Sequence, residues 1–558
     1  MSLTKVTYSM IKGSVANVLD YGAVGDGTTD DTAALQAAID ANPNKTIFLP
    51  RGVYLSSGLT ISSNNTLLRG EGMTPGGTVI RPSNTTGNDV TFTGQQSGME
   101  RICIQPIVKK TSGYAVYVTG GAFRVVIDSI QVAYGYNAFG IVSATETRIS
   151  NCQVRYLIGI RGVDFRGTSL IGSFRAIVNN FEADNPYPLA PPTPTTSPAL
   201  SWAATTPFAL TNVVVVNGAI WMCTQAGTSG LSAPLGYPGT TAQEIFSTEI
   251  TDGSVKWKFV SSDALNWIVQ DSYAYSFVIN EAALLNGARA FLMVDSLATG
   301  SSYPQWCFAW DLECDHNYFG GVLQSNGYGI YITGSWIGYA LSGSGVTADI
   351  NGLGEIYVGG GTRIVGNSQN GVTIYAGPKS IIIDGNFIGT NSTQAINVYH
   401  GISIAPNATK IQITNNTIGL LPTFVGSSPL MANSNLQGYG VFVDIGTSNE
   451  YVVANNNLVG NSLGSIFDAG TGTTKRIANN LGYNPSAFTA ITVTASPFTY
   501  TNNTGNTASV SITGGTVSSV LVNGLATNTA TNCMVSVPQG MTVQVTYSSL
   551  PTMNYSIH

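Results

Sequence analysis

A stretch at residues 306–318 reads WCFAWDLECDHNY and places three carboxylates at alternate positions. Side chains of a β-strand alternate between its two faces, so a strand here points Asp311, Glu313 and Asp315 to one side, together with Ala309. The other set is predicted to point inward: Phe308, Trp310, Leu312 and Cys314. Successive carboxylates then lie about 7 Å apart, and their repulsion raises at least one pKa. A protonated carboxyl beside an ionised one is the pair that glycoside hydrolysis requires.

Asp295 ends an apolar run about one repeat earlier in the chain, and it is expected to stack beside the strand at 311–315. We therefore predict an acid–base pair drawn from Asp295, Glu313 and Asp315, with Asp311 as a positioning or pKa-raising neighbour. A carboxyl separation of about 6.5–9.5 Å would indicate inversion, and one of about 5–5.5 Å would indicate retention. Two alternatives stay open: such acids are often only solvated, or an intersubunit site uses Glu281, Glu355 or Asp349.

The run Glu313–His316 also contains residue types that bind metals. On a strand, however, Glu313 and Asp315 face away from Cys314 and His316, so the four side chains cannot converge on one ion. We therefore predict no metal and no other cofactor. His316 and His400 are the internal histidines, and with so few no Ser/His/Asp arrangement can be recognised.

Aromatic side chains near these acids are candidates for substrate binding, because sugar rings have apolar faces that stack on aromatic rings. Tyr331 lies between Ile330 and Ile332, so alternation points it outward, where it would stack on a sugar. The alternative is a place in the core or in a subunit interface. The substrate-binding candidates are Trp336, Tyr331, Tyr318, His316 and Arg363.

The composition limits the kind of scaffold that can position these residues. Charged side chains make up 9 % of 558 residues, apolar ones 43 %, and there are 64 glycines. This composition excludes a disordered chain or a coiled coil. The net charge of −6, without a basic run, argues against nucleic-acid binding. No apolar stretch is long enough to span a membrane. Six scattered cysteines are predicted to be reduced core residues or one incidental pair, not a disulfide framework or zinc site: 103, 152, 223, 307, 314 and 533.

Internal repeats indicate a β-solenoid. Gly371–Gly389 and Gly401–Gly419 are both 19 residues long and match at isoleucine and asparagine positions, and a looser copy covers Gly440–Gly460. Short alternating strands at such spacing, with no helices between them, predict an all-β right-handed parallel β-helix. Its isoleucines would stack inward. Its asparagines would form a structural corner ladder: Asn386, Asn416 and Asn456.

The organisation of the chain follows from where the repeats stop. A helix at Thr32–Ala41, capped by Asp30 or Asp31, is expected to cover the open end of the solenoid. A second, weak helical pattern lies at Glu281–Gly287. A proline-rich run from Asn185 leads into a small β module with Asn-Gly and Asp-Gly turns. The predicted divisions are 1–45 with the capping helix, 46–185 and 263–485 for the β-helix, 186–262 for the inserted module, and 486–558 for a C-terminal β domain.

The sequence VLDYGAVGDGTTDDTAALQAAI at 18–39 resembles the N-terminal signature of the pectate-lyase-like superfamily. That resemblance implies a right-handed parallel β-helix that acts on polysaccharides. Residues 5–11 and 543–557 resemble bacteriophage tailspike proteins, and the segment 202–260 is similar to small carbohydrate-binding modules, with Trp202, Trp221 and Trp257 as aromatic marks. One departure is that the signature begins at Val18, without a preceding particle-binding head. Either the head was removed, or attachment goes through another protein.

The resemblance implies a homotrimeric spike in the virion tail, attached to a phage tail or baseplate protein, that binds and cleaves a bacterial capsule or O-antigen. The predicted activity is endo-acting glycoside hydrolysis. A polysaccharide lyase acting by β-elimination is the second hypothesis, for which Arg289, Arg363 and Lys379 are the basic candidates. The scarcity of basic residues favours hydrolysis. A non-catalytic glycan-binding spike and a secreted pectinase also stay open, the pectinase being weakened because no signal peptide is recognised.

Overall fold

The computed structural model describes residues 15–189, 200–234, 239–298, 301–349, 354–377, 380–419, 436–483, 488–527 and 531–557. The segment at 5–11, most of the proline-rich run and Lys379 lie outside these residues. The chain forms two compact units. One comprises Met1–Thr347 with Arg363–Gln369, and the other comprises Ala348–Thr362 with Asn370–His558.

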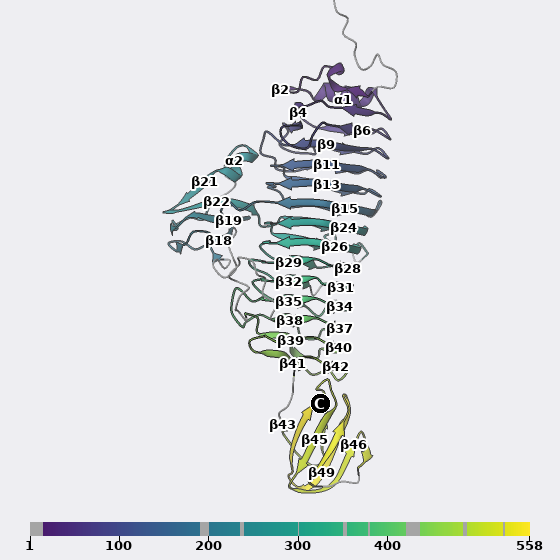
Figure 1. The fold of residues 1–558 in the computed structure, drawn as a ribbon, viewed down its shortest axis with the longest axis vertical. Coiled ribbons are helices and arrows are strands. Elements are labelled where there is room, and N and C mark those ends of the chain that lie inside the picture. Colours follow the sequence, from purple (N-terminus) through teal and green to yellow (C-terminus); the bar gives the residue numbers. More distant parts are fainter. Residues whose placement is uncertain are drawn as a thin grey trace, which may run out of the picture. The chain divides into compact units, whose positions relative to one another are not determined.

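The first unit is a parallel β-helix, as the sequence predicts (Figure 1). Strands of successive coils pair in parallel and in register because each coil repeats the same pattern of inward apolar residues. One sheet contains β1 (Ala16–Asn17), β2 (Asp26–Asp30), β3 (Thr46–Phe48), β4 (Gly52–Ser56), β6 (Leu67–Arg69), β7 (Thr78–Pro82), β9 (Gly98–Ile104), β11 (Val126–Ala133), β13 (Arg148–Arg155), β15 (Ser173–Asp184), β24 (Ala274–Leu285), β26 (Gln305–Asp315), β28 (Tyr328–Thr333), β29 (Trp336–Gly338) and β32 (Arg363–Val365).

A second parallel sheet closes the other side of each coil. It contains β5 (Leu59–Ile61), β8 (Val90–Phe92), β10 (Tyr114–Val118), β12 (Asn137–Val142), β14 (Arg161–Arg166), β23 (Asn266–Gln270), β25 (Arg289–Met293) and β27 (Val322–Gln324). The predicted helix at Glu281–Gly287 is wrong, because Glu281 lies within β24. The alternation of buried and exposed residues along this strand continues through its alanines and leucines.

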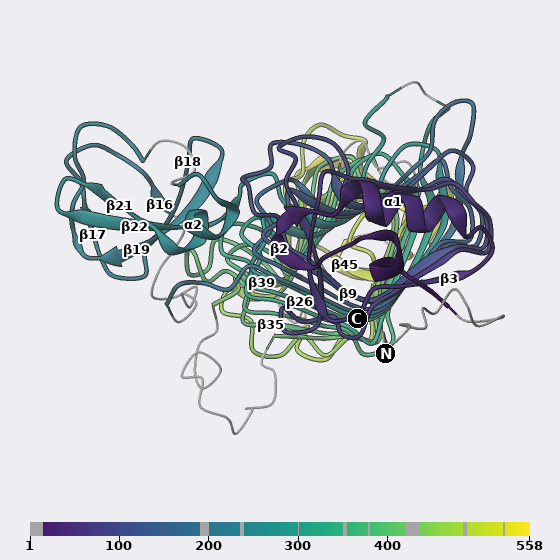
Figure 2. The same ribbon diagram turned by 90° about the horizontal axis from the view of Figure 1, so that it is seen from above.

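The predicted N-terminal helix is α1 (Thr32–Ala41), which lies across the first coils and buries Leu35, Ala38 and Ile39 (Figure 2). Asp31 is the N-cap residue, yet its carboxylate accepts hydrogen bonds from the backbone of Val24 and Gly25, at 2.6 and 3.1 Å. Asp30 instead accepts from the Thr32 N–H at 2.9 Å. The acids of the N-terminal signature therefore hold the backbone of the cap.

Left-handed residues at equivalent positions bend the first sheet. Ser129, Asn151, Asn180, Glu281 and Asp311 all have φ between 47° and 55°, and the register aligns them across β11, β13, β15, β24 and β26. Asparagine and aspartate tolerate this conformation, whereas most other residues adopt it at a cost of about 1–2 kcal/mol. The groove described below is lined by four of these residues.

A small, mostly antiparallel module is inserted between β15 and β23 and lies beside the coils (Figure 2). Its described strands are β16 (Leu200–Ser201), β17 (Pro207–Phe208), β18 (Val213–Val216), β19 (Ala219–Gln225), β20 (Gly227–Thr228), β21 (Glu249–Asp252) and β22 (Val255–Ser262), with the helix α2 (Ala242–Ser247). Trp221 and Trp257 are fully buried, and the Trp202 indole donates to Asp252 at 2.9 Å. These two buried tryptophans are core residues, so they present no face to a sugar.

The second unit continues the coil pattern and ends in a separate β domain. Its coils contain β31 (Glu355–Gly359), β33 (Val372–Ile374), β34 (Ser380–Asp384), β35 (Phe387–Gly389), β36 (Ile402–Ile404), β37 (Thr409–Thr414), β38 (Thr417–Gly419), β39 (Tyr439–Gly446), β40 (Asn449–Ala454), β41 (Gly464–Gly470) and β42 (Lys475–Ala478). Two antiparallel sheets follow, one with β43 (Thr489–Ile491), β45 (Ala508–Thr513), β48 (Cys533–Val537) and β50 (Thr552–Ile557), the other with β44 (Phe498–Thr501), β46 (Thr516–Val522), β47 (Leu525–Ala526) and β49 (Thr542–Ser549).

The predicted asparagine ladder is confirmed in this unit. The side-chain oxygen of Asn416 accepts from the Asn386 N–H at 2.9 Å, that of Asn456 accepts from the Asn416 N–H at 3.0 Å, and Asn480 extends the ladder by one coil at 3.1 Å. All four amides are buried. The side-chain oxygens of Asn416, Asn456 and Asn480 thus each accept a backbone N–H at the corner of the preceding coil.

Replacing Asn416 with alanine should destabilise the protein by about 3 kcal/mol, because buried donors of Asn386 lose their acceptor. Chemical denaturation measures this change. Gln412→Ala is the matched control in the same coil, since Gln412 is exposed on β37, the strand that precedes Asn416, and it should change the free energy of unfolding by less than about 0.5 kcal/mol. Equal stability of the two variants would contradict a structural role for the ladder.

Candidate active site

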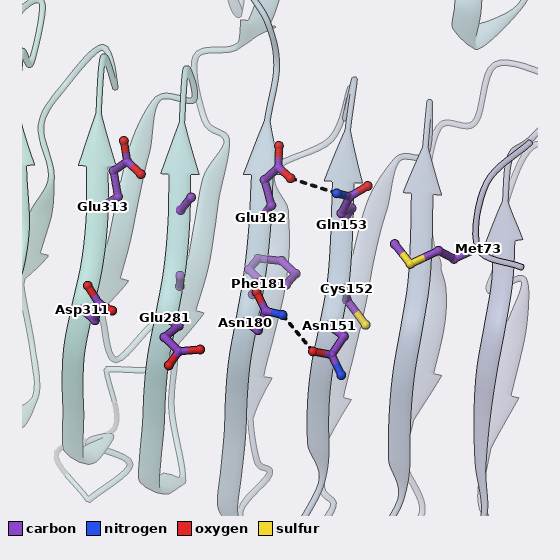
Figure 3. A pocket seen from close by; sticks show the side chains of 12 residues that line it. Met73, Asn151, Cys152, Gln153, Asn180, Phe181, Glu182, Glu281, Asp311 and Glu313 are labelled. Atoms are coloured by element: carbon purple, nitrogen blue, oxygen red, sulfur yellow. Dashed lines mark hydrogen bonds between the residues drawn. The ribbon is translucent and has the colours of Figure 1, made fainter.

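A groove of about 500 Å³ lies on the outer face of the first unit, across β13, β15, β24 and β26 (Figure 3). Two rows of side chains line it. One row is the column of left-handed residues, and the other row lies two residues further along each strand. The first row is Asn151, Asn180, Glu281 and Asp311, and the second row is Gln153, Glu182, Ala283 and Glu313. The groove therefore changes from amides on β13 to carboxylates on β26.

The predicted alternation of β26 is only partly correct. Asp311 and Glu313 point outward and Leu312 and Cys314 inward, as expected. Phe308 and Trp310 are exposed and Ala309 is buried, which is the opposite of the prediction. The physical reason is the left-handed conformation of Asp311, at φ 55°, which inserts one residue into the alternation so that Trp310 and Asp311 both face outward.

Glu182 is held by polar neighbours at the far side of the groove. Its carboxylate accepts hydrogen bonds from the Gln153 amide at 2.9 Å and from the Arg155 guanidinium, with which it forms an ion pair. In Figure 3 the bonds from Gln153 to Glu182 and from Asn180 to Asn151 are drawn. These two donors fix the orientation of the Glu182 carboxylate in the groove.

The side chains of Glu281, Asp311 and Glu313 form no hydrogen bond or ion pair with any other described residue. Partial burial in the groove raises the pKa of Glu313, and the negative charges of Asp315, Asp311 and Glu182 raise it further. Glu313 therefore holds a proton more readily than an ordinary glutamate does. The acids Glu182 and Glu281 belong to this groove as well, and the first of them was not predicted.

Asp315, the third predicted acid of this strand, lies beyond the groove. Its side chain accepts from the backbone N–H of His316 at 3.0 Å and lies 3.1 Å from the His316 ring nitrogen Nδ1. The His316 ring stacks on Tyr339 with centroids 5.2 Å apart. Asp315 and His316 therefore form a polar pair one side-chain position further along the outer face.

The expectation that Asp295 stacks beside β26 is wrong. Asp295 follows β25, which belongs to the second sheet, whereas β26 belongs to the first. Its side chain is 2 % exposed and accepts hydrogen bonds from the hydroxyls of Ser272 and Ser302, at 2.7 and 2.6 Å. Asp295 is thus a buried structural carboxylate, and the acid–base pair cannot include it.

The substrate-binding candidates divide into outward and buried side chains. Trp336 pairs with Glu313 across the neighbouring strands, and Arg363 pairs with Trp336 one coil further on. Tyr331 stacks on Phe308 with centroids 5.1 Å apart. Tyr318 is 4 % exposed, and burial raises its pKa to about 12. The prediction that Tyr318 contacts substrate is therefore wrong, because its ring packs inside the fold.

Among the residues that the structure describes, no three histidine, cysteine, aspartate or glutamate side chains gather in a group able to hold a metal. The described helices α1 and α2 are both too short to cross a membrane. None of the described cysteines forms a disulfide bond.

Comparison with known proteins relates the first coils to a family. Residues 15–162 match the family model described as rhamnogalacturonase A/epimerase, pectate lyase-like. The pectate-lyase-like resemblance predicted from residues 18–39 is thereby confirmed, and the parallel coils of the structure agree with it.

Individual relatives match shorter stretches. The chain is 32 % identical over 177 residues to depolymerase 1, capsule K30/K69-specific, of Klebsiella phage K5-2, covering 26 % of this chain and 21 % of that protein. It is 48 % identical over 86 residues to mannuronan C5-epimerase AlgE5 of Azotobacter vinelandii, covering 13 % and 8 %. The A-module of epimerase AlgE6 from the same organism is a structural neighbour with a TM-score of 0.48 and 16 % identity, covering 84 % and 100 %. The chain spans less than a quarter of the length of either curated relative.

Proposed function

We propose that the protein is an endo-acting glycoside hydrolase that cleaves a bacterial surface polysaccharide in the groove across β13–β26. The observation that carries the proposal is the pairing of Glu313, a carboxyl with a raised pKa and no side-chain partner among the described residues, with Glu182, whose carboxylate is oriented by Arg155 and Gln153. One proton donor and one anionic base are what the reaction requires.

The spacing of the two carboxyls favours inversion. Glu182, Ala283 and Glu313 occupy one register position on three neighbouring strands, which separates the two backbones by about 10 Å. Ala283 leaves space between the carboxyls because its side chain is a single methyl group. A water molecule there gives a proton to Glu182 as its oxygen attacks the anomeric carbon. Glu313 gives its proton to the departing glycosidic oxygen, so the glycosidic bond breaks and both products are neutral.

Asp311 acts on this reaction through Glu313. Its negative charge raises the pKa of Glu313, so Asp311→Asn should lower that pKa. Because the reaction needs protonated Glu313, the alkaline limb of the pH–rate profile should move to lower pH. The profile of kcat/KM measures this shift. Asp20→Asn is the control, since Asp20 is exposed in the short helix at Val18–Tyr21 and does not line the groove. An unmoved limb in Asp311→Asn would contradict the coupling.

The substrate and setting of the protein are proposed from its relatives. A phage depolymerase specific for a bacterial capsule matches a quarter of the chain, which supports a tailspike that acts on a capsule or O-antigen in the virion tail. We propose a homotrimer attached to a tail or baseplate protein. Light scattering of the purified protein should give three times the mass of one chain, and the mass of a single chain would refute the trimer.

A polysaccharide lyase is the second candidate, because the chain also matches a mannuronan epimerase over 86 residues. The His316–Tyr339 stack and Arg363 would then supply the base and the cation. Digestion of purified capsular polysaccharides and O-antigens distinguishes the two, with reducing ends and absorbance at 235 nm followed together. New reducing ends without absorbance support the hydrolase, and both signals together support the lyase. Binding without either signal would leave a non-catalytic spike.

A further inference from the structure

Three aromatic side chains lie exposed in a row on β26, directly before the acids of the groove. Trp306, Phe308 and Trp310 are 48, 40 and 42 % exposed, and Trp310 is followed at once by Asp311. Their steps of two residues correspond to about 7 Å along the strand. The backbone has positive φ at Trp306 and at Asp311. Between these two positions the strand alternates regularly, with the three aromatic residues exposed and Cys307 and Ala309 buried.

Two of these rings, those of Phe308 and Trp306, contact residues of β28. Phe308 stacks on Tyr331 at an interplanar angle of 14°. Trp306 lies against Gly329, where an added Cβ would come within 3.0 Å of the indole. Gly329 also has a φ of 75°, which a glycine adopts without strain. Phe308 and Trp306 are therefore packed against β28 rather than loose.

The surroundings of the rings are uncharged but able to form hydrogen bonds. No charged residue occurs at 274–280, 305–310 or 328–333, the three strand segments that pair here. Asn280 and Thr333 flank Trp310 in the register. Neither Trp306 nor Trp310 has a hydrogen-bond partner for its indole N–H among the described residues. Apolar ring faces beside free donors and amides suit a ligand with both apolar faces and hydroxyl groups.

We infer that the aromatic strip of Trp306, Phe308 and Trp310 binds uncharged sugar units of the polysaccharide whose bond is cleaved at Glu313. The inference rests on the proposed function, because the strip continues the groove on the same strand. Sugar rings stack on the aromatic faces, and their hydroxyl groups accept from the indole N–H donors. The absence of charge over the three strand segments selects against uronate residues at these positions, because a carboxylate placed there would lose water without gaining a cation.

Binding to an array of purified capsular polysaccharides and O-antigens tests the strip, with Glu313→Gln as the parent so that bound glycan is not cleaved. Trp306→Ala and Trp310→Ala should each bind at least tenfold more weakly than the parent. Trp310→Phe keeps a stacking face and loses only the donor, so its loss should be smaller. Phe488→Ala is the matched control, since Phe488 is an exposed aromatic residue outside the strip. Repeats made only of uronates should bind the parent and the strip variants alike.

Several results would overturn the inference. One is parent-like binding by both tryptophan variants, and another is an array on which the parent binds nothing. A changed oligomeric mass of Trp306→Ala in light scattering would instead make the strip an interface between copies. Failure of the proposed function looks different: the strip variants lose binding, yet the wild type releases no reducing ends from any glycan that it binds.

Discussion

Replacing Glu313 with glutamine should lower the rate of glycan cleavage about a thousandfold or more while leaving the fold intact. Glutamine has nearly the same shape but no acidic proton, so the departing oxygen receives none, and general acid catalysis of this kind contributes about 10²–10⁴-fold. Reducing-end release under single-turnover conditions measures the loss. The melting temperature should not fall, because the substitution removes one of several repelling charges.

The matched control is Glu450→Gln, an exposed glutamate of the second unit for which full activity is expected. A Glu313→Gln variant that cleaves within threefold of the wild-type rate would refute Glu313 as the acid. A variant that is inactive and also melts much earlier would assign Glu313 a structural role instead.

Replacing Glu182 with glutamine should lower cleavage by about 10²–10⁴-fold, because the attacking water loses its base. The substitution also leaves Arg155 without its ion-pair partner, so a loss of activity alone is not sufficient. Glu182→Ala should therefore also be assayed with azide, whose attack needs no base. Azide should restore cleavage and give a glycosyl azide of inverted anomeric configuration, detected by NMR.

Gln153→Ala is the control for this second prediction. Gln153 donates one hydrogen bond to Glu182 at 2.9 Å, and its removal leaves the Arg155 ion pair in place, so the rate should fall less than tenfold. Retention of configuration in the first product of the wild-type enzyme would contradict the assignment of Glu182 as base, because retention requires a nucleophilic carboxylate close to the acid.

The scaffold was predictable because its signals are local and repeated. The isoleucines of the two 19-residue copies pair as expected, with Ile381 opposite Ile411 and Ile383 opposite Ile413. The asparagine corners recur at a fixed place in each copy. Stacking repeats the same chemical requirement in every coil, so one pattern predicts all of them.

The candidate site was only half predictable, because two of its causes are not local. Glu182 and Ala283 are about a hundred residues apart in sequence, and the inserted module between β15 and β24 hides the fact that they lie on neighbouring coils. The exposure of Trp310 depends on the left-handed conformation of Asp311, a local departure from regular strand geometry that a period of two cannot show. Asp295 was misplaced because the sequence does not say to which sheet a strand belongs.

The most direct test of hydrolysis by this groove is the mass of the products formed in water enriched in ¹⁸O. A glycan that the protein cleaves is digested, and the fragments are weighed by mass spectrometry beside a digest in ordinary water. Each new reducing end should carry one added water with a single ¹⁸O atom, and Glu313→Gln should release none. Fragments that lack the added water and absorb at 235 nm would contradict the account and establish β-elimination.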